Sequence, residues 1–127
     1  MTRGDEIVAA ARSCVGARFR VHGRVPGFGL DCVGVAAIAF GRAVPGDYPL
    51  RGGSAARIAA AIAAAGLARR DSAGPGDLLL VEAGPGQLHL AVLTGRGFVH
   101  ADAGLRRVVE TPGRPAGAVL GIWGEEG

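Results

Sequence analysis

Hydrophobic residues in the first half of the chain recur at the spacing of helices. Three segments predict helices: residues 5–15, 32–40 and 54–65. Asp5 and Asp31 come directly before the apolar positions of the first two segments, where an N-cap residue stands, and Gly16 and Gly66 end the first and third. The second segment is apolar on every side, so we expect it to be buried.

Short apolar runs between tight turns replace this pattern after Gly76. Five of them predict strands: residues 77–81, 88–93, 98–101, 107–110 and 119–123. Loops are expected over residues 17–31, which leave room for a short extended piece, and over residues 44–53. Helices followed by a run of short strands indicate an α+β fold with an antiparallel sheet, and 127 residues fit a single domain over residues 1–127.

The composition excludes several classes of protein. A chain with 49% hydrophobic and 20% charged residues is too apolar for intrinsic disorder, and it has no apolar run of the roughly 18 residues that a membrane span needs. The net charge of +3 comes from arginines that do not cluster into a stripe, and aromatic residues make up only 5%. We therefore expect neither a membrane nor a nucleic acid as partner.

Two cysteines, Cys14 and Cys32, are too few for a disulfide framework, and no CxxC motif indicates zinc. The first six residues lack the basic region and apolar run of a signal peptide. These features predict a protein that is synthesised in the cytoplasm, is not exported by the general secretory route and holds no metal.

Cys32 is the candidate nucleophile. In the first turn of a helix a thiol lies beside free backbone N–H groups, which favour the thiolate and stabilise an oxyanion after attack on a carbonyl. Gly29 and Gly34 on either side allow a substrate backbone to come close. A buried structural cysteine is the alternative for Cys32, and it is the favoured interpretation for Cys14, which lies on the apolar face of the first helix.

A thiolate enzyme needs a base and a group that orients it. His89 opens a predicted strand with Leu88 and Leu90 on the opposite face, and His100 lies on the next strand, within reach on one face of the sheet. Asp102, two residues after His100, is the alternative candidate for the residue that orients the base. His22 precedes Cys32 and is expected to line the cleft. Each histidine taken singly is better explained by a structural role, and a metal site built from all three has irregular ligand spacing.

These residues resemble the NlpC-type family of cell-wall peptidases. Residues 16–24 and 29–35, GARFRVHGR and GLDCVGV, are similar to the family's nucleophile region and most similar to the subgroup encoded in phage tail modules and gene transfer agents. Residues 76–80, His89 and residues 98–101 (FVHA) resemble its second half. Along the chain the Cys comes first, then the His and then the polar residue, whereas the His comes first in the circularly permuted relatives. The resemblance covers roughly residues 7–123.

The resemblance implies a papain-like α+β fold and hydrolysis of peptide bonds in peptidoglycan stem peptides, usually between γ-D-glutamate and the diamino acid. It implies Cys32 as nucleophile, His89 as general base and His100 as orienting residue, with no metal or organic cofactor. Two positions depart from the family: Phe19 stands where many members have a Tyr whose hydroxyl assists the nucleophile, and Val33 stands where a Ser is common.

Stem peptides carry carboxylates, which the guanidinium group of Arg binds well. The candidate substrate-binding residues are Arg18, Arg20, His22, Arg24 and Asp31. Since no export signal is present, the resemblance also predicts a component of a phage-like particle that acts on the cell wall, with phage-like tail proteins as partners. Two alternatives remain open: an amidase or acyltransferase that uses the same Cys and His residues on another substrate, and a tail-tip structural subunit with a vestigial site, which Phe19 favours.

Overall fold

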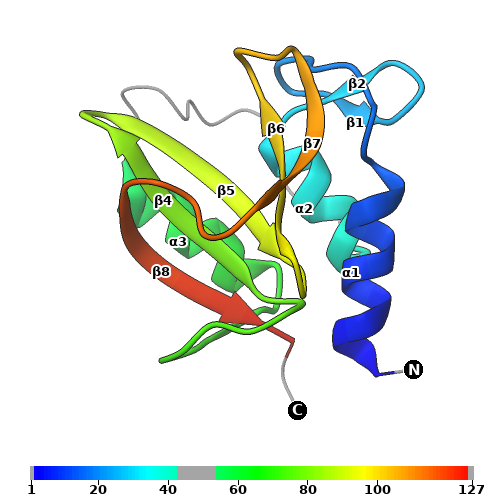
Figure 1. Ribbon diagram of the computed structural model, residues 1–127. Coiled ribbons are helices and arrows are strands. Elements are labelled where there is room, and N and C mark those ends of the chain that lie inside the picture. The colour runs from blue at the N-terminus through cyan, green and yellow to red at the C-terminus, as the bar shows by residue number, and fades with distance from the viewer. Residues whose placement is uncertain (1, 43–53, 126–127) are drawn as a thin grey trace.

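The computed structural model describes residues 2–42 and 54–125, which form three helices and eight strands (Figure 1). The helices are α1 (Arg3–Ser13), α2 (Cys32–Phe40) and α3 (Ala55–Ala64). The strands are β1 (Arg24–Val25), β2 (Gly29–Leu30), β3 (Ala68–Arg69), β4 (Leu78–Gly84), β5 (Gln87–Leu93), β6 (Gly97–Asp102), β7 (Arg107–Pro112) and β8 (Ala118–Gly124). The loop predicted over residues 44–53 lies outside the described residues.

Six of the strands form one antiparallel sheet in the order β3-β8-β4-β5-β6-β7, and β1 and β2 form a separate small hairpin. The α+β class and all five predicted strands are confirmed. The strand β3 was not predicted, and β1 and β2 were foreseen only as a possible short extended piece within residues 17–31, because pieces of two residues show no alternation of polar and apolar positions. The segment before Cys32, predicted as a loop, therefore folds back on itself as a hairpin.

The start of α1 differs from the prediction. Thr2, not Asp5, is the N-cap residue: its Oγ1 accepts a hydrogen bond from the Asp5 N–H at 3.1 Å, and Asp5 Oδ2 accepts one from the Thr2 N–H at 3.1 Å. This reciprocal capping box extends the helix by two residues and uses Asp5 inside its first turn. Asp31 caps α2, as predicted, and Ser54, which was predicted only to begin the third helix, is the cap of α3.

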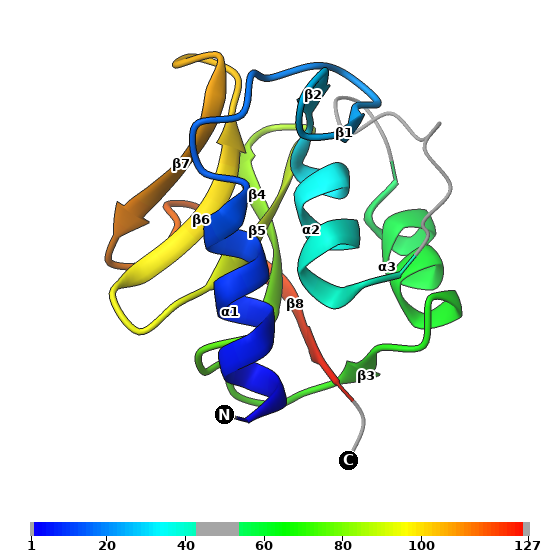
Figure 2. The same cartoon turned by 90° about the vertical axis from the view of Figure 1, so that its right-hand side faces the viewer.

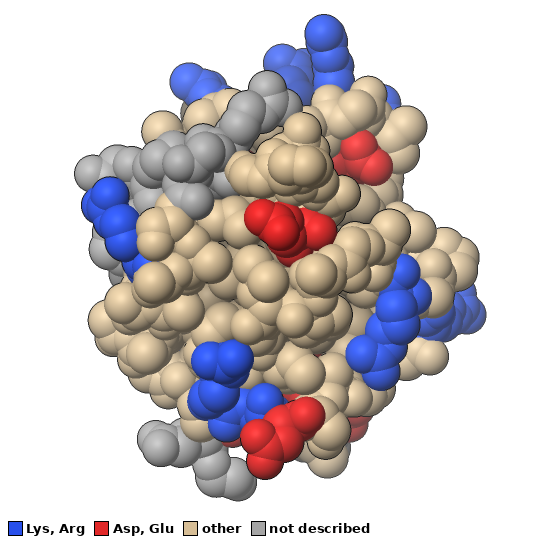
Figure 3. Space-filling model, turned by 90° about the vertical axis from the view of Figure 1, so that its left-hand side faces the viewer, with Lys and Arg blue, Asp and Glu red and all other residues tan. Residues whose placement is uncertain are grey.

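The main core lies between α1, α2 and one face of the sheet (Figure 2). Alternate strand residues, such as Leu90, Val92 and Val99, point into it, and a smaller cluster around Leu79 and Phe98 covers part of the other face. Among the described residues no helix is long and apolar enough to cross a membrane. Arginines on the face drawn in Figure 3 lie in separate groups around a centre that carries acidic side chains.

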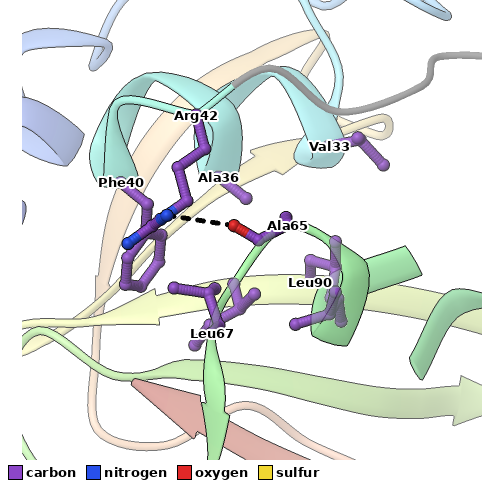
Figure 4. Close-up of a pocket in the computed structure, with 9 residues that line it drawn as sticks. Val33, Ala36, Phe40, Arg42, Ala65, Leu67 and Leu90 are labelled. Atoms are coloured by element: carbon purple, nitrogen blue, oxygen red, sulfur yellow. Dashed lines mark hydrogen bonds between the residues drawn. The ribbon is translucent and has the colours of Figure 1, made fainter. Parts of the chain in front are cut away.

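A cavity of about 30 Å³ remains between α2, α3 and the sheet (Figure 4). Its lining is apolar except for Arg42, whose Nη1 donates to the carbonyl of Ala65 at 3.1 Å. The volume suits about one water molecule, so the cavity is a packing gap and too small for a substrate. A larger open hollow of about 330 Å³ lies at the turn between β5 and β6, and its lining contains none of the candidate residues.

Candidate active site

The strands β5 and β6 pair over only part of their length. Val92 pairs with Val99 and Leu93 pairs with Phe98 next to the turn, whereas β4 with β5 and β6 with β7 each form six registered pairs. Beyond Val92 and Val99 the two strands separate, and α2 contacts both of them. The sheet is therefore open at the ends of β5 and β6 that carry His89 and His100.

Cys32 begins α2 and meets this opening. The N–H of Leu93 donates to the carbonyl of Asp77, on the β4 side, so the N–H of Leu90, three residues away, points toward β6. No β6 residue is paired with Leu90, and its N–H instead lies by the Cys32 side chain, where it favours the thiolate. The Leu90 N–H, which would bond to β6 in a fully paired sheet, therefore faces the thiol of Cys32.

Burial controls the ionisation of Cys32. The residue is only 3% exposed, and burial raises the pKa of its thiol to about 12. The nearby charge of Asp31 acts in the same direction, while hydrogen bonds from the N–H groups of Leu90, Cys32 and Val33 oppose it. The N–H groups of the helix N-terminus favour the thiolate as expected, but the loss of hydration outweighs them, so the net change is a raised pKa. The resting side chain is a neutral thiol.

His89 and His100 contact each other directly. His89 Nε2 lies 2.8 Å from His100 Nδ1, and the two rings meet edge to face with centroids 5.0 Å apart. Leu88 and Leu90 point into the core on the other face of β5, as predicted. Burial and, to a smaller extent, the His100 ring lower the pKa of His89 to about 4, although Asp102 opposes the change. Burial also lowers the pKa of His100, so both imidazoles are neutral at pH 7.

The bond to His100 leaves Nδ1 as the free ring nitrogen of His89. Cys32 and His89 lie on adjoining elements, since α2 contacts β5, but no hydrogen bond joins their side chains among the described residues. Asp102 does not bond to either ring. Its Oδ1 accepts the N–H of Leu105 at 3.0 Å, and it acts on the histidines only through its charge.

A buried carboxylate ties the β1–β2 hairpin to the first turn of α2. Asp31 is 5% exposed; its Oδ1 accepts from Gly34 N and Arg24 Nη1, both at 2.9 Å, and its Oδ2 accepts from His22 N at 2.7 Å. With three donors already bound, this carboxylate has a structural task, and we no longer expect Asp31 to contact a substrate. Arg24 is held in the same ion pair.

The glycines around Cys32 serve the protein's own packing. A Cβ on Gly34 would collide with the carbonyl oxygen of Gly23, and a Cβ on Gly23 would collide with that of Gly29. The expected close approach to these glycines is therefore made by the hairpin backbone rather than by a substrate. Phe19 packs against the core and forms a β-bridge with Leu30, and its side chain has no hydroxyl to offer.

The other predicted substrate-binding residues lie on the surface at this end of the molecule. Arg18, Arg20 and His22 are exposed, and Arg18 is paired by backbone with Arg107 of β7, so two arginines stand opposite each other. Neither has an ion-pair partner within the described part of the chain. The described residues contain no group of three or more His, Cys, Asp and Glu residues that could hold a metal, so His22 does not join His89 and His100.

Thr111 contacts the site and was not predicted. Its Oγ1 lies 2.9 Å from His100 Nε2, and Phe98 packs against the same ring with centroids 4.6 Å apart. Thr111 stands opposite Phe98 in the β6–β7 register, diagonal to His100. Only that register brings Thr111 to the imidazole, and the sequence alone does not fix it.

No family model and no curated protein matches the chain. Several solved structures are similar to the chain. The NlpC/p60 domain of the peptidoglycan hydrolase SagA is 25% identical, with a TM-score of 0.60 over 86% of this chain and 88% of that domain. The peptidoglycan hydrolase RipB of Mycobacterium tuberculosis is 23% identical, with a TM-score of 0.61 over 95% of this chain and 63% of that one.

A third structure, the P60 domain of the antigen MAP1204 from M. avium subspecies paratuberculosis, is 19% identical, with a TM-score of 0.61 over 97% of this chain and 93% of that one. The likeness extends over most of the chain and includes both the helices and the six-stranded sheet. The chain has the papain-like α+β fold of the NlpC/p60 domains.

Proposed function

We propose that this protein is a cell-wall hydrolase of the NlpC type, a cysteine peptidase that cleaves peptide bonds in peptidoglycan stem peptides. The observation that carries the proposal is the direct contact between His89 and His100 on β5 and β6, the two strands that α2 contacts, with Cys32 in the first turn of that helix. The likeness to peptidoglycan hydrolase domains supports the substrate class.

In the proposed reaction the Cys32 thiol attacks the carbonyl carbon of the scissile amide. The Sγ–C bond forms while the thiol proton passes to Nδ1 of His89, the ring nitrogen that His100 leaves free. The carbonyl oxygen becomes an oxyanion, which backbone N–H groups of the first turn of α2 stabilise. The C–N bond then breaks, and the proton on His89 goes to the leaving amine.

Hydrolysis of the thioester completes the cycle. His89 takes a proton from water, the hydroxide attacks the acyl carbon, and the acid leaves as the proton returns to the sulfur of Cys32. Because Cys32 and His89 are both neutral at rest, the proton moves during the attack and no ion pair waits in the free protein. His100 orients the base in this scheme, in preference to Asp102, which has no bond to His89.

Finer features belong to the same proposal. The bond cleaved is the one between γ-D-glutamate and the diamino acid, and exposed Arg18 and Arg20 bind carboxylates of the stem. The protein acts at the cell wall as a component of a phage-like tail, with phage-like tail proteins as partners. The chemistry needs no cofactor, and neither nucleic acid nor membrane takes part.

One alternative has an observation in its favour. Cys32 is 3% exposed, its pKa is raised to about 12, and Phe19 supplies no hydroxyl, features that a structural subunit with a vestigial site would also have. An amidase or acyltransferase would use the same three residues on another acyl donor. The first experiment must therefore separate an active thiol from an inert one.

The test is digestion of purified diaminopimelate-type peptidoglycan, with the released fragments identified by mass spectrometry. Cys32→Ala is the inactive variant and Cys14→Ala is the matched control, since Cys14 is an equally buried thiol that bonds to Ala10 O on its own helix. We expect stem cleavage by wild type and by Cys14→Ala only. If none of the proteins releases a fragment, the peptidase proposal fails. Trapping of an acyl group on Cys32 by an activated ester would then favour the transferase, and an unreactive Cys32 the structural subunit.

A further inference from the structure

His100 uses both of its ring nitrogens. Nδ1 lies 2.8 Å from His89 Nε2, and Nε2 lies 2.9 Å from Thr111 Oγ1. A continuous chain of hydrogen bonds therefore crosses three neighbouring strands, from His89 on β5 through His100 on β6 to Thr111 on β7. It ends at a hydroxyl group, the one kind of partner here that can either donate or accept.

The direction of the bond to Thr111 fixes where the proton of His89 lies. A neutral imidazole carries one N–H, so His89 can accept a proton at Nδ1 only if its own proton is on Nε2. His89 then donates to His100 Nδ1, and the His100 proton must be on Nε2, facing Thr111. In the opposite direction Thr111 donates to His100, His100 donates to His89, and Nδ1 of His89 already carries a proton.

We propose that Thr111 is a positioning residue of this site: its hydroxyl oxygen accepts the Nε2 proton of His100 and thereby keeps Nδ1 of His89 free to act as a base. Thr111 is only half-buried, so its own hydroxyl proton can be given to solvent while its oxygen accepts. Phe98 packs against the His100 ring and restricts a rotation that would take both nitrogens away from their partners. The inference rests on the proposed function for its effect on catalysis, but the position of the protons can be measured without any substrate.

The experiment compares wild type, Thr111→Val and Thr111→Ser by ¹⁵N NMR of histidine-labelled protein at pH 7.5, where both imidazoles are neutral. Val keeps the shape of Thr but has no hydroxyl, and Ser keeps the hydroxyl. We expect His100 to be protonated on Nε2 in wild type and in Thr111→Ser, and to show a mixture of tautomers in Thr111→Val. Thr94→Val is the control. It removes a buried hydroxyl that donates to Glu110 at 2.7 Å, and it should lower stability without moving the histidine signals.

The activity arm uses stem-peptide cleavage. Thr111→Val should lower kcat by about 10- to 100-fold, as for other residues that orient a functional histidine, with KM little changed and with activity restored in Thr111→Ser. Two results would overturn the proposal. One is a wild-type His100 that is protonated on Nδ1, and this result counts even if Thr111→Val fails to fold. The other is a Thr111→Val protein whose His100 tautomer and pH profile are unchanged. If the tautomers change as expected but no variant cleaves peptidoglycan, the proton arrangement is supported and the peptidase function is the part that fails.

Discussion

The buried imidazole of His89 predicts how the stability of the protein depends on pH. Burial lowers the pKa of His89 in the folded protein to about 4, whereas the same group in the unfolded chain titrates near about 6.5. Between these values the unfolded chain binds more protons than the folded one, so the free energy of unfolding rises with pH through this window. The stabilisation is complete above about pH 7 and is lost as the solution is acidified.

The size of the effect follows from the two pKa values. At pH 5.0 the unfolded imidazole is almost fully protonated while the folded one is still about nine-tenths neutral, so His89 alone costs the protein about 2 kcal/mol of stability relative to pH 7.5. His89→Gln removes the titration and keeps a side chain that can bond to His100. We therefore expect wild type to lose about 2 kcal/mol more than His89→Gln between pH 7.5 and 5.0.

Urea denaturation at several pH values measures this difference. The single tryptophan, Trp123, is 3% exposed in the folded protein and gives a fluorescence signal for unfolding. Carboxylates such as Glu110, whose pKa is lowered mainly by its bond to Arg12, titrate equally in both proteins and cancel in the comparison. Equal slopes for wild type and His89→Gln would refute the claim that His89 is held neutral by burial.

Three further outcomes are expected. Alkylation of Cys32 by iodoacetamide should accelerate with pH up to at least pH 9, because its pKa is raised to about 12, and a plateau at neutral pH would instead reveal a thiolate–imidazolium pair. Gly34→Ala should lower the free energy of unfolding by about 1–3 kcal/mol in urea denaturation, since the new methyl group meets the backbone of Gly23. Gly27→Ala, whose new methyl group meets no other atom, should change the free energy of unfolding little. Similar values for the two variants would contradict the packing described for the hairpin. Arg18→Ala should raise KM for stem peptides with free carboxylates more than for amidated ones, and an equal effect on both would remove Arg18 from substrate binding.

Elements long enough to show a period were predictable. The three helices and five main strands follow from their apolar spacing and turn residues, and Asp31 as the cap of α2 follows from its position before an apolar run. The start of α1 was misplaced because Thr2 and Asp5 are both good capping residues, and only the geometry shows that they cap each other.

Parts of the site were out of reach for a different reason. The sequence placed His89 and His100 on neighbouring strands, and their contact is present, but the separation of β5 and β6 depends on how α2 packs against them. The contact of Thr111 with His100 depends on register. The raised pKa of Cys32 depends on burial by the whole fold, which a helix N-terminus in the sequence does not reveal.

The incomplete pairing of β5 and β6 sets the stability of the sheet against the exposure of a backbone N–H group to Cys32. A redesign could continue the backbone hydrogen bonds between β5 and β6 from Val92 and Val99 to the ends of both strands. It would give the N–H of Leu90 a carbonyl partner on β6 and make the sheet more regular. The same change would withdraw the Leu90 N–H from Cys32 and push α2 away from the sheet. Selection for heat resistance alone would therefore favour the more regular sheet, and a thermostable version that keeps the proposed thiol chemistry must gain its stability elsewhere.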